Sequence, residues 1–115
     1  MKQIQVVVRW SMYKMSWQEF DDRCRVLAKK IKRNRKIKDI YGIPRGGLPI
    51  AVRLSHLTKL PLTNNPRPNH TLVCDDCVDS GSTKNSFKNF KYFEVLVDKQ
   101  KEGITEWIEF CWEKK

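Results

Sequence analysis

The chain has 115 residues, a length that suits a single domain (residues 1–115) with one modest core. Apolar residues make up 40% of it, which is above the range of disordered chains, and no stretch is long and apolar enough to span a membrane. Its start lacks the apolar run of a signal peptide, so we expect a cytoplasmic protein with reduced cysteines. The formal net charge of +10 favours anionic partners such as phosphates, nucleotides or nucleic acid.

The first half of the chain predicts strand, helix, strand and helix in that order. A short strand is expected at residues 6–10. Ser16, with Glu19 three residues later, has capping-box spacing, and the apolar residues that follow recur at helical spacing over about five turns. Residues 39–43 form an apolar run that ends at a Gly-Gly turn, which predicts a buried strand, and helical periodicity follows in residues 48–59.

A run of cations stands where the first predicted helix ends. Seven of the ten residues from Lys29 to Lys38 are basic. We interpret the run first as the solvated end of a basic helix, where the helix dipole favours positive charge. A nucleic-acid patch is the alternative, although nucleic acid is not the expected partner, and it predicts steeply salt-dependent binding.

The second half predicts further strands, a turn-rich connection and a short helix. The strands are expected at residues 60–62, 71–75, 92–99 and 105–113, the connection at 63–70 and the helix at 83–90. Strands that alternate with helices predict an α/β fold with a mostly parallel sheet flanked by helices. In such folds ligands bind beyond the carboxyl ends of the strands.

Two glycine-containing loops follow predicted strands, in the segments YGIPRGGL and CDDCVDSGST. In the second, Gly81 permits close backbone approach, and N–H groups at the start of a helix form an anion site to which nearby hydroxyl groups add donors. In the first, Arg45 supplies a forked cation suited to phosphate oxygens. The alternative for each loop is a purely structural role, as an ordinary turn or helix cap with polar neighbours.

Carboxylates, more than cysteines, mark the second loop. Asp75 and Asp76 end an apolar strand, where charged groups are costly unless something binds them, and they suit diol hydroxyls or Mg²⁺. Asp79 lies across the same loop and could act as an acid or base. Cys74 and Cys77 have CxxC spacing, but no second pair completes a zinc site, so we expect both to be packing residues.

Three segments together resemble the type I phosphoribosyltransferases, closest to the compact purine enzymes of the xanthine-guanine and hypoxanthine type. TLVCDDCVDSGST is similar to that family's motif for phosphoribosyl pyrophosphate (PRPP), YGIPRGGL to its pyrophosphate loop, and the tail EWIEFCWE to its purine-site ending. The resemblance implies the family fold with a reduced hood and a short flexible loop at residues 63–70. It also implies that the pyrophosphate loop carries a non-proline cis peptide.

The resemblance implies a role for each matching residue. Asp75 and Asp76 would hold the ribose hydroxyls, with Mg²⁺ bound there directly or through water, and Asp79 would be the catalytic acid or base. The remaining assignments are the 5′-phosphate site (Asp79, Ser80, Gly81, Ser82, Thr83), the pyrophosphate site (Arg45, Gly46, Gly47) and the base site (Lys99, Trp107, Ile108).

The implied activity is transfer of the phosphoribosyl group from PRPP to a 6-oxopurine, namely xanthine, guanine or hypoxanthine, with release of pyrophosphate. This is a purine-salvage reaction that uses Mg²⁺, and the resemblance also implies a homodimer. The lack of a long apolar stretch leads us to expect no membrane partner. The alternative is a non-catalytic module that binds PRPP or a nucleotide on the same fold.

Overall fold

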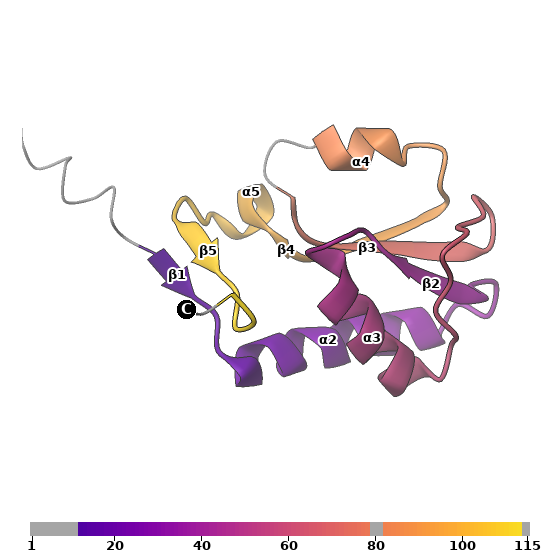
Figure 1. Cartoon of the computed structure of the whole chain (residues 1–115), viewed down its shortest axis with the longest axis horizontal. Coiled ribbons are helices and arrows are strands. Elements are labelled where there is room, and N and C mark those ends of the chain that lie inside the picture. Colours follow the sequence, from indigo (N-terminus) through magenta and orange to yellow (C-terminus); the bar gives the residue numbers. More distant parts are fainter. Residues whose placement is uncertain (1–11, 79–81, 114–115) are drawn as a thin grey trace, which may run out of the picture.

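Two parallel sheets organise the chain in the computed structural model, which describes residues 12–78 and 82–113 (Figure 1). Side chains are described for the same residues except 82 and 83. In chain order the elements are β1 (Met12–Lys14), α2 (Trp17–Lys32), β2 (Asp39–Gly42), α3 (Gly47–Thr58), β3 (Thr71–Val78), α4 (Ser82–Ser86), β4 (Tyr92–Asp98), α5 (Lys99–Glu102) and β5 (Trp107–Glu109).

The central sheet has the order β2-β3-β4 and is parallel throughout, as the sequence predicted. Helices α2 and α3 cover one face, while α4 lies over the other (Figure 1). On the α4 side, Phe87 packs against Tyr41 of β2 and Phe93 of β4, with ring centroids 6.2 and 6.4 Å apart. The central strand β3 is therefore covered on both faces, which explains why residues 71–75 are all buried.

Helix α2 follows the predicted pattern from its first residue. The Ser16 hydroxyl accepts a hydrogen bond from the Glu19 N–H at 3.0 Å, the expected N-cap. Its apolar stripe is buried in the core: Phe20, Cys24, Ala28 and Ile31. Burial raises the pKa of the Cys24 thiol to about 12, so this cysteine behaves as a small apolar residue, as expected.

Several predicted boundaries differ from the structure. Strand β3 continues through Val78 because it stays paired with β4 up to Asp98. The predicted strand at residues 60–62 is a single bridge between Leu62 and Ile40, and the helix expected at 83–90 ends at Ser86. The strand expected at residues 6–10 lies outside the described residues.

The tail forms a shorter strand than predicted. Only Trp107–Glu109 is a strand, because its partner β1, which the sequence did not predict, is itself three residues long. Beyond it, Phe110 stacks on Trp112 with ring centroids 4.8 Å apart, so these aromatic residues pack in a turn. In the part of the chain that the structure describes, no helix has the length and apolar character to cross a bilayer.

Candidate functional site

The loop between β2 and α3 is fixed against the central strand. The Ile43 N–H donates to the Cys74 carbonyl at 3.0 Å, which ties the loop to β3. The peptide bond between Pro44 and Arg45 is cis, as the family resemblance implied for this loop. Arg45 is exposed at the start of α3 and therefore accessible to a ligand at the carboxyl edge of the sheet.

Two glycines let this loop touch β3. A β-carbon added at Gly46 would lie 2.2 Å from an Asp76 carboxylate oxygen. One added at Gly47 would lie 2.4 Å from the Cys74 carbonyl oxygen. Both distances are below any normal contact. A larger residue at Gly47 would push the loop away from the backbone of β3, and one at Gly46 would displace the Asp76 carboxylate. The structure thus brings the predicted pyrophosphate loop directly against the predicted ribose carboxylates.

Asp75 and Asp76 form a coupled acidic pair at this edge. Asp75 is only 8% exposed, and its carboxylate accepts a hydrogen bond from the Asp76 N–H at 2.8 Å. The Asp76 carboxylate accepts one from the Cys77 N–H at 2.7 Å. Burial, followed by the hydrogen bond and charge of Asp75, raises the pKa of Asp76 to about 6. Both residues lie within β3, which continues to Val78, whereas the sequence predicted that the strand would end at this pair.

The pair fits a hard divalent cation, because carboxylate oxygens are suitable ligands and a cation would relieve their mutual repulsion. The described residues contain no group of three or more His, Cys, Asp or Glu able to hold a metal ion. A cation at Asp75 and Asp76 would therefore need further oxygens from a bound ligand or water, which is common for Mg²⁺.

A hollow of about 330 Å³ extends from Asp76 of the acidic pair to the predicted base site. It brings Lys99, Trp107 and Ile108 together with Asp76, although these residues come from three different parts of the chain. Ile108 is buried at 5% exposure and forms a floor, whereas the Trp107 indole is 71% exposed and offers a free aromatic surface. Such a surface can stack on a planar base.

Three further lining residues had no role in the sequence-based assignment: Cys77, Phe110 and Glu113. The Glu113 carboxylate accepts a hydrogen bond from the Phe110 N–H at 3.0 Å, which folds the tail back after β5. A continuous strand through residue 113 would have placed the Phe110 and Glu113 side chains on opposite faces. The turn after β5, which the sequence did not predict, is what brings both to the hollow. The tail motif contained both residues but did not show that they line the hollow.

The predicted 5′-phosphate site is only partly visible. Asp79, Ser80 and Gly81 lie outside the described residues, so their predicted roles remain predictions. Ser82 and Thr83 begin α4 and are the first described residues after Val78, the last residue of β3. Their backbone position agrees with a strand-loop-helix connection at this edge of the sheet.

Neither cysteine of the CxxC pair points to metal chemistry. Cys74 is completely buried, its Sγ lies 3.8 Å from the Gly47 carbonyl oxygen, and burial raises its pKa. Cys77 is half-buried beside the core and lines the hollow next to Asp76. The predicted packing role is confirmed for Cys74, while Cys77 also contributes to the wall of the candidate site.

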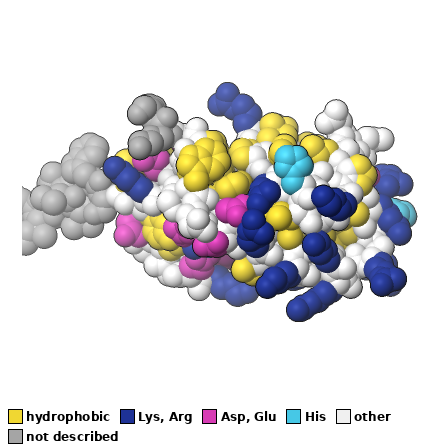
Figure 2. All heavy atoms as spheres, turned by 90° about the horizontal axis from the view of Figure 1, so that it is seen from below, with side chains coloured by type: hydrophobic (Ala, Val, Ile, Leu, Met, Phe, Trp, Pro, Cys, Tyr) yellow, Lys and Arg dark blue, Asp and Glu magenta, His cyan; other side chains and the backbone are white. Residues whose placement is uncertain are grey.

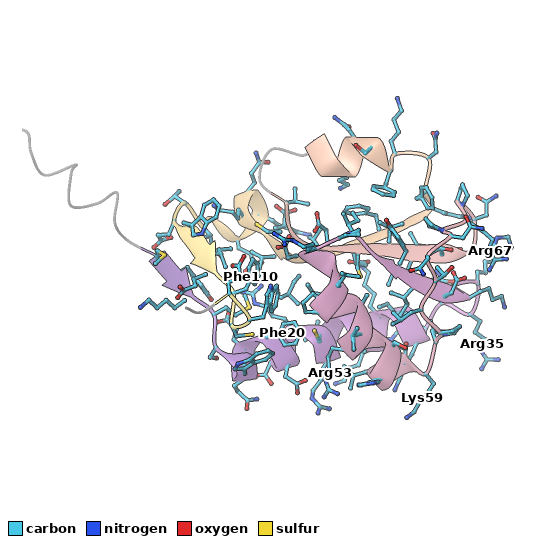
Figure 3. The ribbon with its side chains drawn as sticks, in the orientation of Figure 1. Phe20, Arg35, Arg53, Lys59, Arg67 and Phe110 are labelled. Atoms are coloured by element: carbon cyan, nitrogen blue, oxygen red, sulfur yellow. The ribbon has the colours of Figure 1, made fainter. Side chains whose placement is uncertain are left out.

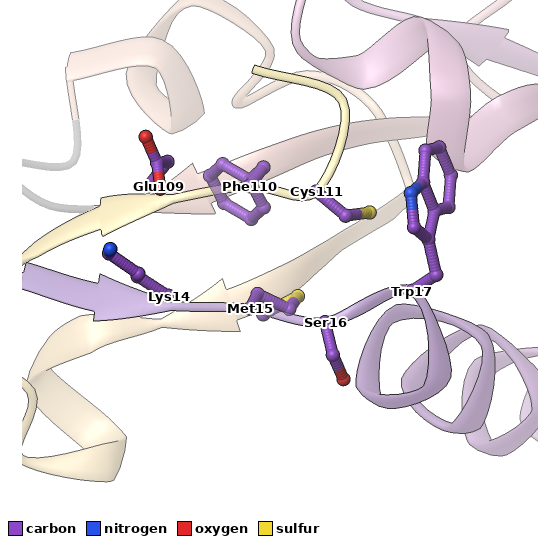
Figure 4. A pocket seen from close by; sticks show the side chains of 7 residues that line it. All are labelled: Lys14, Met15, Ser16, Trp17, Glu109, Phe110 and Cys111. Carbon is purple, nitrogen blue, oxygen red and sulfur yellow. The ribbon is translucent and has the colours of Figure 1, made fainter. Parts of the chain in front are cut away.

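Another hollow, of about 410 Å³, lies where β1 and β5 meet the start of α2 (Figure 4). Lys14, Met15 and Trp17 line one side, and Phe110 and Cys111 line the other. None of the predicted site residues lines it. The candidate site is therefore the hollow at the carboxyl edge of the central sheet.

Comparisons with solved structures identify the fold. The chain is similar to a purine phosphoribosyltransferase from Pyrococcus horikoshii (TM-score 0.68, 22% identity, covering 90% of this chain and 95% of that one). It is also similar to a xanthine-guanine-hypoxanthine phosphoribosyltransferase from Helicobacter pylori (TM-score 0.66, 20% identity, covering 90% of this chain and 94% of that one). A hypothetical protein from Neisseria gonorrhoeae with bound ppGpp is similar to the same degree (TM-score 0.66, 20% identity, covering 90% of each chain).

No protein-family model and no curated protein matches the sequence. At these identities the structural likeness establishes the fold alone, which is that of the type I phosphoribosyltransferases. The predicted fold class and family resemblance are confirmed.

Proposed function

We propose that the protein transfers the phosphoribosyl group from PRPP to a 6-oxopurine, namely xanthine, guanine or hypoxanthine, and releases pyrophosphate. The observation that carries this proposal is the hollow in which Asp76 meets Lys99, Trp107 and Ile108, beside a loop of closely packed glycines. Two of the structural neighbours are purine phosphoribosyltransferases, which supports it. The reaction would take place in the cytoplasm as a step of purine salvage.

In this reaction a bond forms between a ring nitrogen of the base and the anomeric carbon, and the bond from that carbon to the pyrophosphate oxygen breaks. Arg45 and the N–H groups of the glycine loop would bind the departing pyrophosphate. Asp75 and Asp76 would accept hydrogen bonds from the ribose hydroxyls and hold the sugar in position. Asp79 would exchange the proton of the purine nitrogen as the acid or base.

At the base end, Lys99 would donate a hydrogen bond to the 6-oxo oxygen, and this contact would favour oxopurines over adenine. The Trp107 indole would cover the purine, and Ile108 would support it from the core side. Mg²⁺, held by Asp75, Asp76 and substrate oxygens, would supply positive charge against the pyrophosphate.

The direct test is pyrophosphate release from PRPP and Mg²⁺ with each of six bases: xanthine, guanine, hypoxanthine, adenine, uracil and orotate. We expect release with at least one 6-oxopurine and none with the pyrimidines. Asp79→Ala should lower kcat by about 10² to 10⁴-fold, the usual contribution of an acid or base. Asp22→Ala, which removes an exposed carboxylate of α2, is the matched control. Full turnover by Asp79→Ala would refute the assignment.

A second candidate is a module that binds PRPP or a nucleotide without turnover. The neighbour with bound ppGpp favours it, as does the short segment of residues 63–70 between the Leu62 bridge and β3, which leaves few residues to close over a reaction. Calorimetry with PRPP, GMP and ppGpp decides between the two. Tight binding with no pyrophosphate release from any base would establish the binding module.

We also propose a homodimer, through an apolar face of α2 and α3. Trp17, Leu48 and Val52 are 61%, 45% and 43% exposed and line one shallow hollow next to Arg45. An exposed apolar cluster of this kind favours association with another protein surface. Sedimentation should show a dimer that Leu48→Glu dissociates, whereas a wild-type monomer at high concentration would refute the proposal.

A further inference from the structure

A strongly basic surface lies at the opposite end of the central sheet from the candidate site. From Arg23 to Lys38 the chain contains no acidic residue. The surface, called here the basic end, comprises Lys29, Lys30, Lys32, Arg33, Arg35, Lys36, Lys38 and Lys59, all of them exposed. Figure 2 shows Lys and Arg gathered toward the right, while Asp and Glu lie nearer the other end. In Figure 3, Arg35 and Lys59 lie at this end and Phe110 near the other.

The backbone beneath the basic end is well fixed. Ile31 and Ile37 are buried at 2% and 6% exposure and anchor the run to the core. The Lys38 N–H donates to the His70 carbonyl at 2.8 Å, and the Lys36 N–H donates to Asn34 Oδ1 at 3.1 Å. The cationic side chains therefore project from an ordered turn, which lowers the entropy lost when they bind a partner.

A groove of about 310 Å³ runs through this surface, between the end of α2 and the end of α3. Three cations line it, Lys32, Arg35 and Lys38. Lys59 follows the last residue of α3 and lies beside Thr58, another lining residue. The groove thus brings cations of the basic run together at the ends of the two helices, beside Lys59.

This charge is not neutralised within the described chain. Lys30 pairs with Glu94 at 2.7 Å, and it is the only cation of the basic end in an ion pair with a described residue. The carboxyl ends of α2 and α3 each contribute about half a negative charge, which offsets only a small part. By contrast, Asp21 in the first half of α2 forms ion pairs with Arg25 of the same helix and with Arg53 of α3. An unpaired cluster of this size produces a field that attracts polyanions.

We propose that the basic end binds the phosphate backbone of a duplex nucleic acid. None of the described residues that line the groove is aromatic, so it lacks the platforms on which single-stranded bases stack. The apolar residues of the run are buried, so it also lacks the apolar wedge of a membrane-binding helix. What remains is an array of cations on a fixed frame, which suits regularly spaced phosphates in a sequence-independent way.

The test measures the anisotropy of labelled duplexes of about 20 base pairs, one of DNA and one of RNA, between about 50 and 200 mM salt. The groove variant is the triple Lys32→Glu, Arg35→Glu, Lys38→Glu. Its control is Lys88→Glu, Lys91→Glu, Lys101→Glu, which changes the net charge equally at exposed positions outside the groove. A triple with Gln in place of Glu serves if charge reversal impairs folding, as judged by circular dichroism.

We expect wild-type binding to at least one duplex that weakens steeply with salt, and at least about a tenfold loss in the groove variant. Loss of three phosphate contacts should also reduce the salt slope by about 2 to 3, while the control stays within about threefold of wild type. Equal losses in both variants would show that only net charge matters and would overturn the proposal. Tighter binding to a single strand, or binding only to phosphatidylserine vesicles, would also overturn it. The inference does not depend on the proposed transfer reaction.

Discussion

The two edges of the central sheet use charge in opposite ways. At the carboxyl edge, Asp75 and Asp76 are partly or wholly buried, receive backbone hydrogen bonds and lie against a glycine. At the amino edge, the cations of the basic end are exposed and, with one exception, unpaired among the described residues. A few buried charges give geometric selectivity at high cost, whereas many exposed ones give long-range attraction at little cost. One edge therefore suits a small ligand of defined shape, and the other suits a polyanion.

The largest expected effect is at the apolar anchor of the amino edge. Ile37→Ala removes a side chain that is only 6% exposed and should lower the free energy of unfolding by about 2–4 kcal/mol. Urea denaturation measures it, and Val26→Ala, at a 68% exposed position of α2, is the control with an expected change below about 0.5 kcal/mol. An equally small loss for Ile37→Ala would mean that the basic turn is not anchored as described.

The second-largest loss of stability is expected at the carboxyl edge of the central sheet. Gly47→Ala places a β-carbon against the Cys74 carbonyl, which is backbone and cannot rotate away, and should destabilise the protein by about 1–3 kcal/mol. Gly103→Asn is the control, because no atom lies within 4 Å of an added β-carbon there and Asn tolerates the left-handed conformation of that residue. A Gly47→Ala protein as stable as wild type would contradict the close contact between loop and strand.

Removing the negative charge of Asp76 should stabilise the protein. Its pKa of about 6 lies above the ordinary value of 3.8, so the folded state binds more protons than the unfolded state between about pH 4 and 6. Stability therefore falls as the pH rises through this window. Asp76→Asn should be more stable than wild type by about 1–2 kcal/mol at pH 8 and no different at pH 4. Thermal denaturation at both pH values tests this, and a pH-independent difference would contradict it.

The smallest expected change in stability comes from the basic end itself. Lys36→Gln alters an exposed side chain and keeps the backbone N–H that donates to Asn34 Oδ1, so stability should change by less than about 0.5 kcal/mol. The same substitution removes one cation of the basic end and should reduce the salt slope of duplex binding by about 1. Chemical denaturation and a salt titration of anisotropy measure the two effects, and a large loss of stability would contradict the contrast between the edges.

Local patterns were sufficient to predict most of the central fold. The Ser16 cap, the apolar stripe of α2 and the run before the Gly-Gly turn each encode an element through nearby residues alone. Strand β1 was not predicted because three residues carry too little periodicity and its partner lies near the other end of the chain. The tail was predicted as too long a strand because alternating aromatic residues fit both a strand and the observed turn.

The same distinction applies to the candidate site. Arg45, Gly46, Asp75 and Asp76 belong to contiguous motifs, so the sequence indicated both loops, and the structure brings Gly46 against Asp76. The roles of Phe110 and Glu113 in the wall depend on how the tail folds back after β5, which no local pattern specifies. Propensities also say nothing of how far Asp76 is buried, and therefore could not predict its raised pKa.

The pairing of β1 with β5 has a consequence for the order in which the molecule assembles. Because it joins Met12 to Trp107, nearly the whole chain must be collapsed before this small sheet can form, and loop closure makes such contacts late. A two-stranded sheet of three-residue strands is also the first part expected to open. Since β5 carries Trp107 and Ile108, amide exchange should find this side of the candidate site opening while the central sheet β2-β3-β4 stays closed.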